Sequence, residues 1–332
     1  MVTVVDVAKK AGVSVATVSR VLNSNYLVTK EKRDKVLKAI NELGYVPKTT
    51  ARNEKGSEKK VIVVVAAAII HDVIAGIQDF GEQHGYEIMI SYQASQTKSP
   101  QPWNFLPKEQ LGGLIILNML FNEQELQELS EKVPVVQCSQ YTSIPNAYTV
   151  TVDDENAAYS AVNHLIETGK RNIAFIGLGM EDGEFSVSPN FSKDRYTGYR
   201  KALEDNGIGF NPELVKYGDY TFESGAQLAK EFIEMQAPLD AVFCVTDNIA
   251  VACLNTFKEA GYRIPEDVAI CGFDNQEISE MTSPKLTTVD QPFYEIGFES
   301  MRMLEGIIKG EISTGRRLLI EHKLIKRGST VI

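Results

Sequence analysis

From residue 60 to the end of the chain, short runs of apolar, β-branched residues alternate with longer segments whose apolar residues recur every three or four positions. The short runs are typical of buried strands, and the longer segments are typical of amphipathic helices. Strands are predicted at residues 61–66, 87–91, 113–117, 133–137, 172–177, 240–245, 268–273 and 286–289. Helices are predicted at residues 72–84, 123–132, 156–168, 195–206, 222–235, 249–260 and 294–309.

This alternation of strands and helices predicts parallel, doubly wound α/β sheets. The strands are too many for one small sheet, so two α/β lobes are expected. Ligands of such folds bind at the carboxyl ends of the strands, which here points to a cleft between the lobes.

Three short helices are predicted in the first 45 residues. The first spans residues 4–12 and ends at Gly12, the second begins after Ser14, and the third runs from Thr29 to Gly44. Ser and Thr are suited to cap a helix N-terminus, and glycine commonly ends a helix. This outline is that of a helix-turn-helix DNA-binding domain. Helical spacing alone leaves a three-helix protein-interaction module as an equal alternative.

The second of these helices has two different faces. The apolar face consists of Val18, Val21 and Leu22, and the other face and its edge carry Ala16, Ser19, Arg20 and Asn23. Small residues at Val15 and Ala16 allow the helix tip to enter a major groove, where Arg20 can donate hydrogen bonds to guanine or to phosphate. Ser19 and Asn23 can contact bases or the DNA backbone. The helix therefore has one side for packing and one side for DNA.

Charge is unevenly placed along the chain. Residues 1–60 carry 13 Lys and Arg against 6 Asp and Glu, whereas the remainder carries 21 against 38. A small basic module on a large acidic body suggests that only one end of the protein binds a polyanion. The overall net charge of −10 hides this division.

Composition excludes several other classes of protein. The longest apolar run, residues 61–70, is too short for a membrane helix, which takes about 20 residues. The N-terminus lacks the apolar core of a signal peptide, so a cytoplasmic location is expected. The four cysteines form no C-x-x-C pair and are expected to be buried thiols; they are Cys138, Cys244, Cys253 and Cys271. We expect no metal site and no cofactor.

An enzyme is the main alternative class. The stretch "FIGLGMEDG" places Gly177 and Gly179 after a predicted strand, but its third glycine is Gly183 rather than residue 182. The following "EFSVSPNFSKD" does not open a helix, and a pyrophosphate site needs that helix N-terminus. This argues against a dinucleotide-dependent oxidoreductase. A solute-binding protein is the third class, but it needs an export signal and has no use for the basic first module.

The first 52 residues carry a specific combination of residues. The stretch "VTVVDVAKKAGVSVATVSRVLN", followed by "VTKEKRDKVLKAINELGYVPKTTAR", resembles the N-terminus of the LacI/GalR family of bacterial transcription regulators. The resemblance implies base contacts at Val15, Ala16 and Arg20. It implies contacts on the phosphate side near Thr3, Ser19, Asn23 and Thr29. Arg52 is available for a phosphate in the segment that follows.

The acidic body is similar to the regulatory domain of the same family, which is itself similar to periplasmic sugar-binding proteins. The matching stretches include "DRYTGYRKALEDNGI", "GDYTFESG", "DAVFCVTDNIAVACLNTFKEAGYRIPEDVAICGFDN" and "LTTVDQP". The resemblance implies that the chain crosses between the lobes three times. It implies an effector site at Arg195, Tyr220 and Asp274, with Asp247, Gln291 and Phe293 on turns that face the cleft.

Each effector residue also has a purely structural interpretation. Arg195 can pair with Glu204 or Asp194 on a helix surface, and Asp274 can serve only as a helix cap. Tyr220 can be a core aromatic residue. The structure has to decide between the two interpretations.

Three positions depart from the family pattern. Ile69 and Ile70 stand where aromatic residues that face the ligand are common, and the proline-rich segment 99–108, with Trp103, replaces a long helix. Glu54 stands where many members have a leucine that inserts into the DNA minor groove, so we expect a weakly ordered hinge and tighter operator binding in Glu54→Leu.

The sequence thus predicts a helix-turn-helix DNA-binding domain at residues 1–47, a hinge at 48–59, and an effector-binding and dimerisation domain of two α/β lobes at 60–332. The predicted function is a dimeric repressor that binds a pseudo-palindromic DNA operator under the control of a sugar or nucleoside. The stretches "RNEK", "GDYTFESG", "QPFYEIG" and "LIKRGST" look closest to the cytidine-repressor branch of the family. The C-terminus shows no leucine-rich heptads, so a homodimer rather than a tetramer is expected.

Overall fold

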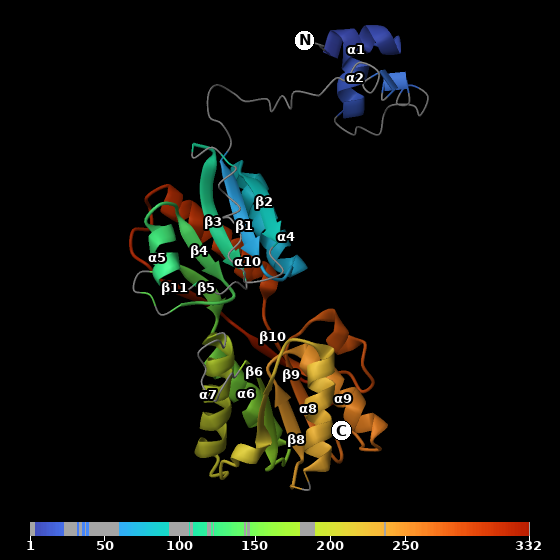
Figure 1. The fold of residues 1–332 in the computed structure, drawn as a ribbon, viewed down its shortest axis with the longest axis vertical. Helices are drawn as coiled ribbons and strands as arrows, with labels where there is room; N and C mark the ends of the chain where they lie inside the picture. Colours follow the sequence, from blue (N-terminus) through green and yellow to red (C-terminus); the bar gives the residue numbers. More distant parts are fainter. Residues whose placement is uncertain are drawn as a thin grey trace. The chain divides into compact units, whose positions relative to one another are not determined.

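The computed structural model describes most of the chain beyond residue 59 and parts of the first sixty residues. The described residues are 4–22, 32, 35–36, 38–39, 60–92, 106, 109–117, 121, 123–142, 144, 147–179, 190–235 and 237–331, without the side chains of 4, 5, 16, 19, 20, 22 and 190. The chain divides into two compact units between Glu58 and Lys59, and each is described by itself (Figure 1).

The first unit contains the predicted helix-turn-helix geometry. Helix α1 (Val4–Ala11) is followed by Gly12, whose φ is +65°, and by helix α2 (Val15–Leu22). The hydroxyl of Ser14 accepts the N–H of Thr17 at 3.2 Å, which confirms it as the N-cap. The two helices pack through a small apolar core formed by Val7, Ala8, Ala11, Val18, Val21, Val36 and Ala39.

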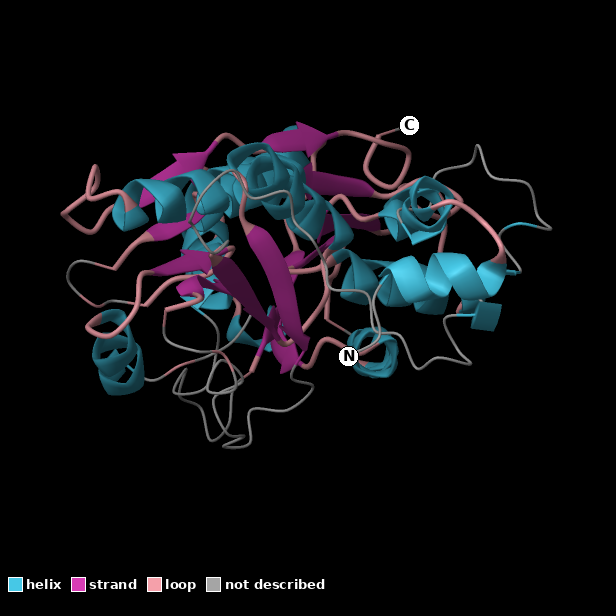
Figure 2. Ribbon diagram, turned by 90° about the horizontal axis from the view of Figure 1, so that it is seen from above, coloured by secondary structure: helices cyan, strands magenta, loops and turns pink. Residues whose placement is uncertain are grey.

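The second unit has two lobes, each built on a six-stranded sheet. The first sheet has the order β11-β5-β4-β3-β1-β2 and is parallel throughout. Its strands are β1 (Val61–Ala66), β2 (Glu87–Tyr92), β3 (Leu111–Leu117), β4 (Val135–Cys138), β5 (Thr149–Val152) and β11 (Arg317–Ile320). Helices α4 (His71–His84) and α10 (Phe293–Ile308) cover one face, and α5 (Glu123–Ser130) packs on the other (Figure 1). Figure 2 shows, from above, helices on both sides of the strands.

The second sheet has the order β12-β10-β9-β8-β6-β7, and only its edge strand β12 is antiparallel. Its strands are β6 (Ile173–Leu178), β7 (Val215–Gly218), β8 (Ala241–Cys244), β9 (Ala269–Asp274), β10 (Thr287–Asp290) and β12 (Lys323–Ile325). The helices are α6 (Asp154–Glu167), α7 (Asn190–Asp205), α8 (Phe222–Glu234) and α9 (Asp247–Glu259), with 3-10 turns η1 (Pro212–Leu214) and η2 (Glu277–Glu280). One continuous apolar core joins this sheet to its helices.

The chain crosses between the lobes three times. It passes from β5 to α6, from β10 to α10, and from β11 to β12. Neither lobe is therefore one continuous segment, as the resemblance implied. All eight predicted strands and all seven predicted helices of this unit are present, with ends that differ from the predicted ends by a few residues.

Strands β5, β7, β11 and β12 were not predicted. Three of them lie at sheet edges, where partial exposure removes the continuous apolar run that marks a buried strand. Strand β5 is buried but is only four residues long and half threonine. Such a short run gives too little periodicity to identify a strand.

Candidate functional site

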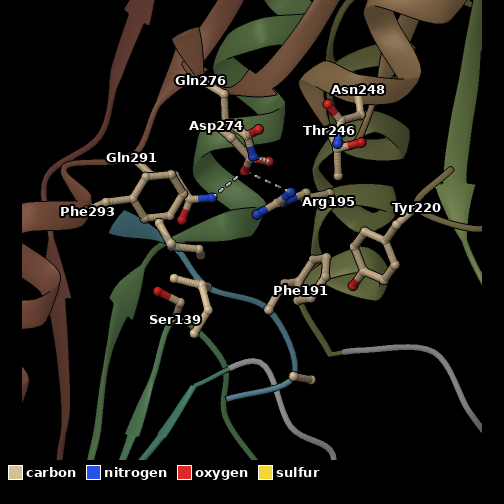
Figure 3. A pocket seen from close by; sticks show the side chains of 14 residues that line it. Ser139, Phe191, Arg195, Tyr220, Thr246, Asn248, Asp274, Gln276, Gln291 and Phe293 are labelled. Atoms are coloured by element: carbon tan, nitrogen blue, oxygen red, sulfur yellow. Dashed lines mark hydrogen bonds and ion pairs between the residues drawn. The ribbon is translucent and has the colours of Figure 1, made fainter. Parts of the chain in front are cut away.

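A pocket of about 480 Å³ lies between the two lobes of the second unit (Figure 3). Most of its lining residues end or closely follow strands β1, β4, β7, β8, β9 and β10, and the others lie on α7 or begin α10. The pocket therefore lies at the carboxyl ends of strands, as the fold class predicts. The lining residues are Ala67, Ala68, Ile69, Ile70, Ser139, Phe191, Arg195, Tyr220, Thr246, Asn248, Asp274, Gln276, Gln291 and Phe293. A volume of this size suits one small ring ligand.

Arg195 is almost completely buried in the wall of this pocket. Its Nε and Nη2 both lie 2.8 Å from Oδ1 of Asp154, and its Nη1 donates to the carbonyl oxygen of Val245 at 2.5 Å. The guanidinium stacks on Phe273, 3.5 Å from the ring centre, and Phe191 lies on it at 4.7 Å. The alternative of a surface pair with Glu204 or Asp194 is therefore wrong, because Arg195 has its partners inside the protein.

The local sequence explains why Asp154 and Arg195 meet. Asp153 caps α6 by accepting the N–H of Asn156 at 3.1 Å, which fixes Asp154 in the first helical turn. Helices α6 and α7 then cross in close contact at Gly198, where an added Cβ would lie 2.1 Å from the carbonyl oxygen of Glu155. Only glycine permits this distance, so Gly198 brings the helix that carries Arg195 against the helix that carries Asp154.

Asp274 is the carboxylate of the pocket wall. It ends β9 with a φ of +110°, an unusual conformation for a non-glycine residue that is typical of functional sites. Its Oδ1 accepts from the amide of Gln291 at 2.6 Å and lies 3.9 Å from Nη1 of Arg195, as Figure 3 shows. Burial raises the pKa of Asp274 to about 6, although Arg195 and Gln291 favour its charged form.

Asp247 does not line the pocket, in contrast to the expectation. Its side chain is fully buried in the first turn of α9, where Oδ1 accepts from the hydroxyl of Thr288 at 2.6 Å and Oδ2 from the backbone N–H of Gln276 at 2.7 Å. Its carboxylate is therefore satisfied inside the protein and is not exposed to the pocket. Asp247 thus holds Gln276, whose side chain does line the pocket.

Aromatic side chains form another part of the wall. Tyr220 is 53% exposed and lies beside Phe191, with ring centres 6.5 Å apart, so it is not a core residue. The turn that carries Tyr220 is held by Asp219, which accepts the N–H of Thr221 at 2.8 Å. Phe293 begins α10 and faces the pocket together with Gln291.

Sequence reasoning missed the pocket residues Ser139, Phe191, Thr246, Asn248 and Gln276. Ser139 follows β4 with a φ of +61°, and its buried hydroxyl has no hydrogen-bond partner in the described part of the chain. The carboxyl end of the predicted strand 133–137 was a usable signal for Ser139. Ile69 and Ile70, recognised as unusual in the sequence, line the pocket from the first lobe.

The predicted DNA-binding residues are only partly described. Val15 lies at the tip of α2 and is 42% exposed, while Val18 and Val21 on the opposite face are buried. The backbone places Ala16, Ser19 and Arg20 on α2. Thr3, Asn23, Thr29 and Arg52, the hinge at 48–59 with Glu54, and Trp103 lie outside the described residues.

The described residues contain no cluster of His, Cys, Asp or Glu that could hold a metal ion. The four cysteines are free and buried, and burial raises the pKa of Cys138 to about 11. No helix in the described ranges is long and apolar enough to cross a membrane.

Two family models match the chain. Residues 3–48 match the model "Bacterial regulatory proteins, lacI family", and residues 162–330 match "Periplasmic binding protein-like domain". The repressor CytR of Escherichia coli K12 is 35% identical over 99% of this chain and 96% of its own length. Catabolite control protein A of Priestia megaterium is 34% identical over 99% of both chains.

Solved structures agree with these relatives. The regulator CelR in complex with cellobiose has a TM-score of 0.74 and 29% identity over 99% of this chain and 100% of its own. The lac repressor dimer bound to its operator has a TM-score of 0.74 and 26% identity over 100% of this chain and 99% of its own.

A helix-turn-helix module joined to a two-lobed, periplasmic-binding-protein-like body defines a class of ligand-responsive transcription regulators. This chain belongs to the lacI family of bacterial regulatory proteins. It is accordingly a DNA-binding transcription regulator.

Proposed function

We propose that this chain is a repressor whose affinity for an operator is set by a sugar or nucleoside bound in the pocket between the lobes. The observation that carries the proposal is the buried Arg195–Asp274 pair in a pocket of about 480 Å³ that also has aromatic walls. An arginine and a carboxylate together supply fixed donors and an acceptor for ligand hydroxyl or amide groups. The chain then regulates by binding rather than by catalysis.

Each effector residue has a defined role in this proposal. Asp274 accepts hydrogen bonds from ligand hydroxyl or N–H groups, and Arg195 donates through the N–H groups that Asp154 and Val245 leave open. Tyr220 stacks on the ligand ring, as Tyr side chains commonly do. Gln291 and Phe293 complete the wall from the crossover between β10 and α10, and Asp247 acts indirectly by holding Gln276.

One similar structure supports a sugar: CelR was solved with cellobiose, a disaccharide. The sequence phrases that look closest to the cytidine-repressor branch favour a nucleoside. We therefore keep both ligand classes, the sugar seen with CelR and the nucleoside that these phrases favour.

We further propose that two copies of the chain bind a pseudo-palindromic operator. The exposed tip of α2 at Val15, with Ala16 and Arg20, reads bases, while Ser19, Asn23, Thr29 and Thr3 contact the backbone and Arg52 a phosphate. The solved lac repressor dimer on its operator supports this arrangement. Such a regulator acts in the cytoplasm and associates with the nucleoid when it is bound to its operator.

A ligand screen on the full chain tests the proposal. A true effector raises Tm by mass action and changes the affinity for an operator selected from random DNA duplexes. Neutral sugars and nucleosides are the compounds to screen. If none of them shifts Tm or operator affinity, the assignment of the pocket fails.

A further inference from the structure

The electrostatic environment of the pocket is dominated by acidic groups. Among the described residues that line it, Arg195 is the only Lys or Arg. Asp154 and Asp274 lie within 4 Å of its guanidinium nitrogens, at 2.8 Å and 3.9 Å. Counted by formal charge, these three residues leave one net negative charge.

Most of the hydrogen-bonding capacity of Arg195 is already used. Two of its five N–H groups donate to Asp154 and a third donates to Val245. Phe273 and Phe191 lie against the guanidinium group. Arg195 can therefore offer a ligand hydrogen bonds, but it has no uncompensated charge to offer.

No other described cation is placed to compensate an anion in the pocket. Arg327 bonds to Asn275 and Glu280, and Arg317 lies over the ring of Tyr141. Neither residue lines the pocket.

The part of the pocket wall that the first lobe supplies does not offset this negative charge. Residues 67–70 are apolar, and Ser139 adds a neutral hydroxyl. Helix α4 begins at this wall without a side-chain cap, and its N–H groups favour negative charge, but Asp72 already occupies its first turn. The partial charge of a helix N-terminus, about +0.5, does not outweigh the acidic wall opposite.

We propose that the effector is an uncharged ring compound with hydroxyl or N–H donors, and that the pocket rejects the phosphorylated forms of the same compound. This inference rests on the proposed function of the pocket as an effector site. A neutral donor satisfies Asp274 without adding charge. A phosphate adds nearly two negative charges near Asp274 and Asp154, where the described part of the chain offers no free cation to pair with them.

Matched ligand pairs test the inference on the full chain by calorimetry. The probes are cytidine, uridine and adenosine with their 5′-monophosphates, and glucose with glucose 6-phosphate. We expect at least one neutral member to bind and its phosphorylated form to bind on the order of tenfold more weakly or worse. The difference should narrow at high salt, because screening weakens the repulsion.

Asp154→Asn tests the cause of the rejection. Asparagine keeps an oxygen that can accept from Arg195 but removes the negative charge, so the preference for the neutral member should fall at least severalfold. Asp267→Asn is the matched control, since Asp267 forms an exposed pair with Arg263 at 2.5 Å and does not line the pocket. The control should leave the preference unchanged.

The outcomes separate the inference from the proposed function. Equal or tighter binding of a phosphorylated member overturns the inference and leaves the pocket as an effector site. An unchanged preference in a folded Asp154→Asn protein also overturns it, because the acidic wall would then not be the cause. If neither these compounds nor those of the wider sugar and nucleoside screen bind, the proposed function itself fails, and the inference fails with it.

Discussion

At the scale of single residues, the pocket depends on how Arg195 is held. The sequence suggested Arg195, Tyr220 and Asp274 through motif resemblance, and the structure brings them together with Gln291 and Phe293. It could not indicate Asp154 as the partner of Arg195, because that contact joins residues 41 positions apart through the packing of two helices. The sequence also could not show that Asp247 faces inward. An Asp at the start of a helix can face a cleft or the protein interior, and the surrounding residues do not distinguish the two.

Arg195→Lys should weaken the pocket despite keeping the charge. Lysine cannot reproduce the planar fork that donates from Nε and Nη2 to Asp154, so we expect effector affinity to fall at least tenfold and the free energy of unfolding to fall by about 1–3 kcal/mol. Calorimetry and urea denaturation measure the two effects. Arg200→Lys on the exposed side of α7 is the control and should change neither.

Effector binding should depend on pH through Asp274. Its pKa is raised to about 6, so the carboxylate loses its charge and part of its acceptor capacity as the pH falls through 6. We expect affinity to be constant above pH 7 and to decline between pH 7 and 5. The decline should disappear in Asp274→Asn, whose weaker binding should not depend on pH; an unchanged pH profile in that variant would assign the titration to another group.

At the scale of elements, the alternation of strand and helix was predictable because buried strands carry continuous apolar runs. The edge strands β7, β11 and β12 were not predictable, because their side chains are partly exposed and their sequences contain no continuous apolar run. The contact between α6 and α7 was not predictable either. Gly198 is a signal for it, because a glycine in the middle of a helix lowers helix stability and is expected there mainly where a neighbouring backbone comes too close for a side chain.

Gly198→Ala should force α6 and α7 apart. The new Cβ would lie 2.1 Å from the carbonyl oxygen of Glu155, so a loss of about 1–3 kcal/mol in unfolding free energy is expected, together with weaker effector binding. Gly209→Ala, where nothing lies within 4 Å, is the control and should be neutral or stabilising. A fully stable Gly198→Ala protein would show that the helix crossing has room to adjust.

At the scale of the whole second unit, a polar link joins the two lobes beside the pocket. Asp194 on α7 accepts from the hydroxyl of Tyr141 and lies 3.8 Å from Nη2 of Arg317 on β11. Arg317 stacks on Tyr141 at 3.8 Å. Tyr141, which follows β4, and Arg317 both belong to the first lobe. Together they hold Asp194, which directly precedes Arg195 in the sequence. Sequence could not predict this link, because it depends on how the lobes meet.

Tyr141→Phe should reduce effector affinity by about threefold to tenfold. Residues of both lobes line the pocket, so an effector bound there would touch both, and loss of a link between the lobes should lower the fraction of molecules in the binding-competent arrangement. The matched control is Tyr294→Phe, which removes a hydrogen bond to Asp79 within the first lobe. Equal effects of the two variants would mean that the link between the lobes has no special part in binding.

The central claim is that a ligand in this pocket controls DNA binding. The most direct test is the operator affinity of the wild type and of Asp274→Asn, measured by fluorescence anisotropy with and without the effector found by the screen. We expect at least a fivefold change for the wild type and none for Asp274→Asn at the same effector concentration. An effector that binds the wild type without altering operator affinity, or that alters it equally in both proteins, would show that this pocket does not control DNA binding.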